Sequence, residues 1–179
     1  MGMSRLRKIE EFSRHQQTPA AHKQLGGEEP WAMRPLEAFA FLSEGASMKR
    51  VLFVCVENSN RSQMAEAFAR MHGGEGVDAA SAGSRPSGRI NPRAVTAMQE
   101  VGYDLTSHGS KGLEDFNGTD VDVAVTMGCG DNCPLVRASR REDWQIPDPR
   151  EMSPEEFREV RDLIERKVLT LLSDLGVSS

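Results

Sequence analysis

The chain has 179 residues, 27% of them charged, and a formal net charge of −5 at pH 7. This length suits one well-buried domain of ordinary size plus an appendage. The negative charge argues against a nucleic-acid partner, because binding to a phosphate backbone relies on clustered lysines and arginines. No apolar run approaches the roughly 20 residues that a membrane span needs, so we expect no membrane partner.

The cysteine content indicates a reducing compartment. The chain has three cysteines, an odd number, and its first residues are charged and lack the apolar segment of a signal peptide. Working thiols in a cytoplasmic protein fit this pattern better than the disulfide framework of a secreted one. We therefore expect a cytoplasmic protein.

Residues 1–48 differ in character from residues 49–179. Residues 13–30 are polar and interrupted by prolines and glycines, whereas residues 31–42 are more apolar and can form a docking helix. We expect an N-terminal extension over residues 1–48, flexible or partly helical, and a catalytic domain over residues 49–179. Met48 directly precedes the first expected strand, so a genuine extension and a start codon assigned too early are both open.

Apolar runs alternate with amphipathic segments through the rest of the chain. Strands are predicted over residues 51–54, 77–82, 121–127 and 143–146. Helices are predicted from residue 62, from Asn91 to a stop at Gly102, and from a capping box at Ser153. Such alternation predicts an α/β three-layer sandwich with a four-stranded parallel sheet and helices on both faces.

The helices are recognised by their apolar spacing. Three- and four-residue steps place the following residues on buried helix faces: Met64, Ala65, Phe68 and Met71; Ala94, Val95, Met98 and Val101; and Phe157, Val160, Ile164, Val168, Leu171 and Leu175.

A polar loop from Cys55 to Arg61 joins the first strand to the first helix. In this geometry free backbone N–H groups and the helix dipole converge on one point, which builds an anion site. A cysteine beside that point has its thiolate stabilised, and the thiolate is the nucleophilic form. The alternative is that Cys55 is a buried structural thiol and Arg61 a surface charge.

A loop of this size can wrap its amides around a tetrahedral oxyanion, while Arg61 offers a planar two-donor fork. Asn58 tolerates left-handed backbone angles, and the Ser62 hydroxyl can donate a hydrogen bond to the Cys55 sulfur. The residues predicted to bind the oxyanion are Val56, Glu57, Asn58, Ser59, Asn60, Arg61 and Ser62.

Two further cysteines, Cys129 and Cys133, follow the third strand, so they lie at the same carboxyl edge of the sheet as Cys55. Three residues separate them, and glycines flank Cys129, which gives the backbone freedom for a local disulfide. A zinc site and two inert buried thiols are the alternatives. Zinc lacks two of its usual four ligands here, so we expect no metal and no other cofactor.

The run over residues 51–67 resembles the phosphate-loop signature of the low-molecular-weight protein tyrosine phosphatase superfamily, and residues 58–66 resemble its arsenate reductase branch. Residues 81–84, 88–92, 110–111, 125–129 and 148–149 support that branch, and the resemblance covers residues 49–175. It implies reduction of arsenate to arsenite by a cysteine nucleophile, with electrons from thioredoxin or a low-molecular-weight thiol.

The resemblance also implies roles for individual residues. Cys55 would attack arsenate, Cys129 would attack the Cys55 sulfur, and Cys133 would resolve the resulting disulfide. Asp148 matches the acid motif of the family and would protonate the departing oxygen. The alternative for Asp148 is a helix cap, although Ser153 already occupies the cap position of the last helix.

Two other functions remain open. A phosphatase would use the same Cys55, Arg61 and Asp148, although Arg150 and Glu151 stand where phosphotyrosine phosphatases commonly have aromatic residues. A non-catalytic oxyanion or redox sensor is the second. For His108, Lys111 and Arg89, which are also expected at this edge, we predict a solvated surface position.

Overall fold

The computed structural model describes residues 47–128 and 136–177. Four parallel strands form one sheet in the order β2-β1-β3-β4. Their bounds are Lys49–Cys55 for β1, Val77–Gly83 for β2, Asp120–Thr126 for β3 and Arg137–Asp143 for β4. The predicted four-stranded parallel sheet is therefore confirmed. Cys129 and Cys133 lie outside the described residues, and so does the expected extension over residues 1–48 except for its last two residues.

Strand β1 is buried on both sides because β2 and β3 flank it and a layer covers each face. Its side chains alternate between two clusters of buried residues. Val51, Phe53 and Cys55 face the larger cluster, while Leu52 and Val54 face the smaller one. The continuous apolar run of the sequence is therefore that of a central strand.

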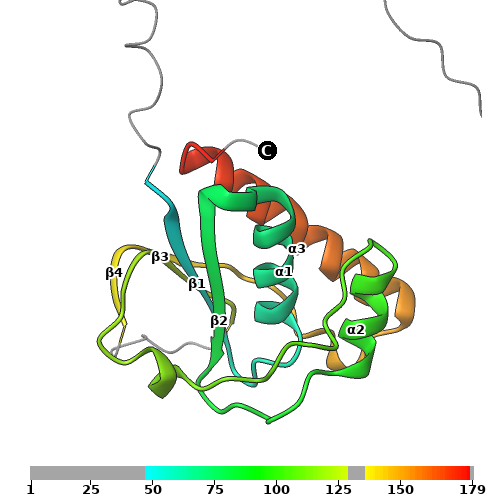
Figure 1. Ribbon diagram of the computed structural model, residues 1–179. Helices are drawn as coiled ribbons and strands as arrows, with labels where there is room; N and C mark the ends of the chain where they lie inside the picture. Colours follow the sequence, from blue (N-terminus) through cyan, green and yellow to red (C-terminus); the bar gives the residue numbers. More distant parts are fainter. Residues whose placement is uncertain (1–46, 129–135, 178–179) are drawn as a thin grey trace, which may run out of the picture. The chain divides into compact units, whose positions relative to one another are not determined.

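The larger cluster lies under the helices α1 (Arg61–Gly73), α2 (Pro92–Gln99) and α3 (Pro154–Asp174). Figure 1 shows α1 and α3 side by side on this face, with α2 beside the start of α3. A 3₁₀ turn, η2 (Leu113–Phe116), packs on the opposite face of the sheet. Both faces are thus covered, as predicted, and the second layer is a single short turn within the described residues.

The predicted helix caps are confirmed. Asn91 accepts a hydrogen bond from Arg93 N and caps α2, with Pro92 as its first residue. Ser153 and Glu156 form the capping box that begins α3, with contacts of 3.2 and 2.7 Å. Helix α2 ends at Gln99, and Gly102 completes the following turn with φ of 87°.

Two predictions are wrong. The fourth strand runs over Arg137–Asp143 and not over residues 143–146; it is a charged edge strand, and edge strands commonly carry charges that discourage further pairing. Trp144 and Ile146, which suggested the strand, are core residues of the segment after it. Met71 is 38% exposed although its spacing placed it on the buried face of α1.

Two short 3₁₀ turns complete the fold, η1 (Gly74–Gly76) before β2 and η3 (Pro149–Glu151) before α3. The remaining buried faces agree with the spacing: Phe157, Val160, Ile164, Val168 and Leu171 of α3 are all core residues. Within the part of the chain that the structure describes, no helix is long and apolar enough to cross a membrane.

Candidate active site

Cys55 ends the central strand, and Arg61 is the first residue of α1. Both are buried, at 3% and 7% exposure, so Arg61 is not the surface charge of the alternative, whereas the burial of Cys55 fits either interpretation. Helix α1 has no side-chain cap and no acidic residue in its first turn. Its positive end is therefore available to an anion held in the loop between these two residues.

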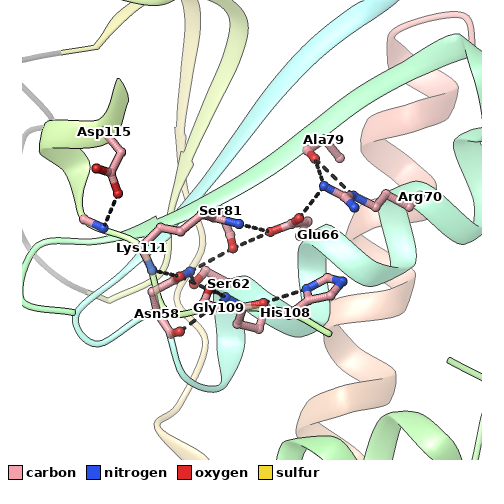
Figure 2. Close-up of polar contacts among 12 residues, drawn as sticks. Asn58, Ser62, Glu66, Arg70, Ala79, Ser81, His108, Gly109, Lys111 and Asp115 are labelled. Atoms are coloured by element: carbon pink, nitrogen blue, oxygen red, sulfur yellow. Dashed lines mark hydrogen bonds and ion pairs between the residues drawn. The ribbon is translucent and has the colours of Figure 1, made fainter. Parts of the chain in front are cut away.

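Asn58 adopts the left-handed conformation that the sequence predicted, with φ of 49°. Four hydrogen bonds hold its side chain. The amide nitrogen donates to Ser62 Oγ at 2.9 Å and to Ser81 Oγ at 2.8 Å, while the amide oxygen accepts from Gln63 Nε2 and Lys111 N at 2.8 and 2.7 Å. Figure 2 shows Ser62, Ser81 and Lys111 around Asn58. All four partners together fix a backbone conformation that few residues other than glycine adopt.

The same contacts place the Ser62 hydroxyl beside the Cys55 sulfur. Ser62 Oγ lies 3.0 Å from Cys55 Sγ and accepts from the Asn58 amide. Either atom can be the donor in this pair; when Cys55 is the thiolate, which carries no proton, the Ser62 hydroxyl donates to the sulfur. A donor aimed at the sulfur favours the thiolate over the thiol.

A buried carboxylate anchors this group of residues. Glu66 is 1% exposed and accepts from Ser81 Oγ at 2.5 Å. Arg70 Nη2 lies 2.6 Å from one of its oxygens and Lys111 Nζ lies 3.3 Å from the other. A buried carboxylate needs such partners, because an unpaired charge is costly to remove from water. The prediction that Lys111 is a solvated surface residue is therefore wrong.

The prediction of a solvated position is also wrong for His108. Its Nδ1 lies 2.9 Å from Gln63 Oε1, and its Nε2 lies 3.0 Å from the hydroxyl of Tyr103. Burial lowers the pKa of His108 and raises that of Tyr103, so the imidazole is neutral and the phenol protonated at pH 7. Only Arg89 is exposed as predicted among these three edge residues.

Arg61 turns its guanidinium toward the segment that carries the predicted acid. Its Nη1 donates to Ile146 O at 3.0 Å, and its Nη2 lies 3.6 Å from Asp148 Oδ2. Asp148 is half-exposed and also accepts from Arg150 N at 3.2 Å, which makes it the cap of η3. The alternative that Asp148 caps the last helix is wrong, because Ser153 caps α3. The cap of η3 uses Asp148 Oδ1 and leaves Oδ2 facing Arg61.

An ion pair joins the loop from Cys55 to Arg61, called here the oxyanion loop, to the segment around Asp148, called here the acid segment. The Arg150 guanidinium contacts the Glu57 carboxylate, and this hydrogen bond holds the pKa of Glu57 below its ordinary value and raises that of Arg150. Both side chains are substantially exposed, so solvent screens the pair and its effect on stability is small. Glu57 and Arg150 line the same pocket, so the pair links the two segments that form it.

Two glycines sit where no side chain fits. A Cβ at Gly83, which ends β2, would lie 2.8 Å from Val56 O and 2.9 Å from Asn58 N. Gly128 has φ of +65°, and a Cβ there would lie 3.1 Å from Arg61 Nη1. The end of β2 therefore supports the oxyanion loop from behind. Gly128, the residue before Cys129, lies directly against Arg61.

One pocket of about 380 Å³ collects most of the predicted site residues. Cys55, Arg61 and Asp148 line it together with Val56, Glu57, Ser59 and Asn60. The side chains of Asn58 and Ser62 are engaged in hydrogen bonds behind the loop, so they support the pocket and do not line it. Sequence reasoning missed Arg85 and placed Arg150 and Glu151 after the acid without assigning them to the pocket lining.

Gln63, Glu66 and Ser81 were also missed, although the sequence carries a signal for the two residues on α1, Gln63 and Glu66. Polar residues recur at three- and four-residue spacing on one side of α1: Gln63, Glu66 and Arg70. Polar side chains at such spacing are unexpected on a buried helix face unless they have partners there.

Among residues 47–128 and 136–177, no group of three or more His, Cys, Asp or Glu side chains is placed to hold a metal ion.

Comparison with known proteins identifies relatives over nearly the whole described domain. Residues 50–178 match the family model of low molecular weight phosphotyrosine protein phosphatases. A glutaredoxin arsenate reductase from Synechocystis is 41% identical over 132 residues, which are 72% of this chain and 100% of the relative.

Solved structures give the same picture. An arsenate reductase in its phosphate-binding state superposes with a TM-score of 0.67 at 41% identity, covering 72% of this chain and 99% of that one. A thioredoxin-dependent arsenate reductase from Corynebacterium glutamicum gives a TM-score of 0.61 at 31% identity, covering 74% and 64% of the two chains. The chain belongs to the low molecular weight phosphotyrosine protein phosphatase family, in the branch that contains these arsenate reductases.

Proposed function

We propose that this protein reduces arsenate to arsenite with Cys55 as the nucleophile. The observation that carries the proposal is the meeting of Cys55, Arg61 and Asp148 around one pocket at the start of α1, in a chain of this family. The helix N-terminus and the Arg61 fork supply positive potential for a tetrahedral oxyanion. Ser62 stabilises the thiolate that attacks it.

In the first step the Cys55 thiolate attacks arsenic(V), forming a sulfur–arsenic bond. One arsenic–oxygen bond breaks, and the oxygen leaves as water after taking up protons, one of them from Asp148. No electrons have yet been transferred, and arsenic stays in the +5 state. Asp148 is suited to this proton transfer because its carboxyl lines the pocket and is half-exposed, so water can restore its proton.

In the second step another thiolate attacks the Cys55 sulfur. A disulfide forms, the sulfur–arsenic bond breaks, and its electron pair stays on arsenic, which leaves as arsenite(III). We assign this attack to Cys129 because Gly128, the residue before it, lies against Arg61. Cys133 then attacks the Cys129 sulfur and frees the Cys55 thiolate.

The resulting Cys129–Cys133 disulfide requires two electrons from an external thiol donor. The Synechocystis relative is named for glutaredoxin and the Corynebacterium relative for thioredoxin, which supports a thiol donor of one of these kinds or a low-molecular-weight thiol. A cytoplasmic location would keep all three cysteines reduced between turnovers. We assign the catalytic domain to residues 49–179 and residues 1–48 to an extension, and the family match beginning at Arg50 supports this division.

The experiment is arsenite production with thioredoxin and its reductase, compared with glutathione and glutaredoxin. Cys55→Ser should abolish arsenite in both systems. Cys129→Ser should abolish repeated turnover if Cys129 attacks the Cys55 sulfur. Full turnover in Cys129→Ser with a small thiol would assign that attack to the external thiol instead.

Hydrolysis of phosphate monoesters is the second candidate, because it needs only Cys55, Arg61 and Asp148. No aromatic residue of the described chain lines the pocket, which disfavours a phosphotyrosine substrate. Hydrolysis of 4-nitrophenyl phosphate should survive Cys129→Ser. A catalytic efficiency with this ester above that with arsenate would make phosphatase the principal activity.

A further inference from the structure

Arg93, in the first turn of α2, reaches across to the segment that carries Asp148. Its Nη1 donates to Arg150 O at 2.9 Å, and its Nη2 donates to Met152 O. The guanidinium also lies over the Phe157 ring, 5.1 Å from its centroid. Arg93 is partly buried, so these contacts are better protected from water than those of an exposed arginine.

The two carbonyls that Arg93 binds come from the end of η3, where a short 3₁₀ turn leaves carbonyl groups without partners in the turn itself. A planar guanidinium can satisfy two carbonyls at once, because its donors diverge at fixed angles. Proline residues at 147, 149 and 154 stiffen the same segment. Arg93 thus ties a stiff segment to α2 at two points.

Contacts lead from Arg93 to the acid through a single residue. Arg150 accepts from Arg93 with its carbonyl and donates to Asp148 Oδ1 with its N–H group. The other oxygen of Asp148 faces Arg61. Displacing the backbone of Arg150 would therefore move Asp148 relative to the oxyanion loop.

The same turn of α2 is attached to the oxyanion loop. Asn91 N donates to Ser59 O at 3.0 Å, and Asn91 Oδ1 accepts from Arg93 N at 2.9 Å. One helix start therefore holds both walls of the pocket, the loop of the nucleophile through Asn91 and the segment of the acid through Arg93. Proton transfer depends on a fixed distance between the acid and the group that it protonates, and a misplacement of about 1 Å can lower the rate about a hundredfold.

We propose that Arg93 is a positioning residue for the general acid, holding Asp148 at the distance from the oxyanion that proton transfer requires. The proposal rests on the acid role of Asp148 in the proposed function. It assigns no contact between Arg93 and the substrate, since Arg93 is absent from the lining of the Cys55 pocket. Loss of Arg93 should therefore reduce kcat and leave oxyanion affinity unchanged.

The test is a double-mutant cycle of Arg93→Met and Asp148→Asn, with arsenate kcat and the inhibition constant of phosphate as the two readouts. Arg93→Met should lower kcat by about ten- to a hundredfold. In the Asp148→Asn background the same change should lower kcat by less than about twofold, because the acid it positions is gone. The inhibition constant of phosphate should stay within about twofold in each variant.

Arg158→Met is the matched control. Arg158 is another arginine between α2 and α3, bound to Glu100 at 2.8 Å by two of its nitrogens, but it does not contact the acid segment. Its kcat should equal that of the unmodified protein. Arg93→Lys should recover part of the lost kcat, because an ammonium keeps the charge over Phe157 and can reach one carbonyl.

Several outcomes would overturn the inference. Losses in kcat that multiply in the double variant would mean that Arg93 does not act through Asp148. A fall in phosphate affinity that parallels kcat would mean a general loss of structure, and so would a kcat loss of equal size in Arg158→Met. If Asp148→Asn alone has normal kcat, the acid role fails and the inference with it, while arsenite formation by Cys55 would stand. Should Arg93→Met not fold, Arg93→Lys carries the same cycle.

Discussion

Ser62 Oγ lies 3.0 Å from Cys55 Sγ and accepts a hydrogen bond from the Asn58 amide, so its own proton can be donated to a Cys55 thiolate. Asn58, whose backbone is in the left-handed conformation, thus holds the Ser62 hydroxyl beside the Cys55 sulfur. The thiolate depends on this contact as well as on the start of α1.

Ser62→Ala should therefore slow the reaction of Cys55. A hydrogen bond to a charged group is worth about 1.5–3 kcal/mol, and its loss should reduce the alkylation rate at pH 7 by about tenfold or more. The measurement is the rate of reaction with iodoacetamide in a Cys129→Ser/Cys133→Ser background. Ser110→Ala is the control, because Ser110 binds the same loop at Glu57 O without touching the sulfur. Equal rates in both variants would remove the assigned role of Ser62.

Gly83→Ala should distort the oxyanion loop. The added Cβ would lie 2.8 Å from Val56 O, and a backbone atom cannot yield as a flexible side chain does. We expect a loss of about 1–3 kcal/mol in the free energy of unfolding, measured in urea, together with weaker competitive inhibition by phosphate. Gly109→Ala is the control, because nothing lies within 4 Å of its Cβ position. Normal phosphate inhibition in Gly83→Ala would contradict the close support of the loop by β2.

The seam between α2 and α3 should lose stability in acid. Hydrogen bonds from Arg158, and then from Arg161, lower the pKa of Glu100 from 4.5 to about 2. Because the folded state binds the proton more weakly than the unfolded one, the stabilisation by Glu100 is present above pH 4.5 and is lost as the pH falls toward 2.

Glu100→Gln isolates this effect. Its urea midpoint should lie below that of the unmodified protein at pH 7, and the difference should shrink between pH 4.5 and pH 2. Glu114→Gln, at an exposed position, is the control and should give no such change. A difference that stays constant over this range would show that Glu100 does not titrate with a lowered pKa in the folded protein.

Local features of this molecule could be predicted from the sequence. The loop between Cys55 and Arg61, the left-handed Asn58 and the capping box at Ser153 each depend on residues close to one another in the chain. Their geometry is set largely by backbone preferences and by nearby side chains. The contact from Ser62 to Cys55 spans one loop and follows from the same local geometry.

Features that depend on distant residues could not be predicted. Lys111 and His108 belong to a polar segment typical of a solvated surface, but the carboxylate and amide that bind them come from α1. Among the described residues the charged strand β4 pairs with β3 alone, so its residues need no apolar pattern. The apolar Trp144 and Ile146 drew the prediction past its end. The contact of Arg93 with Arg150, through which it reaches Asp148, joins positions 57 apart in the sequence and has no sequence signature.

The most direct test of the central claim is the yield of arsenite in a single turnover without an external thiol. The fully reduced protein is mixed with excess arsenate after removal of all small thiols, and arsenite is measured per chain. The account predicts one arsenite per chain, because the protein's own cysteines supply two electrons, and none from Cys55→Ser. An undiminished yield from Cys55→Ser would contradict the assignment of Cys55 as the nucleophile.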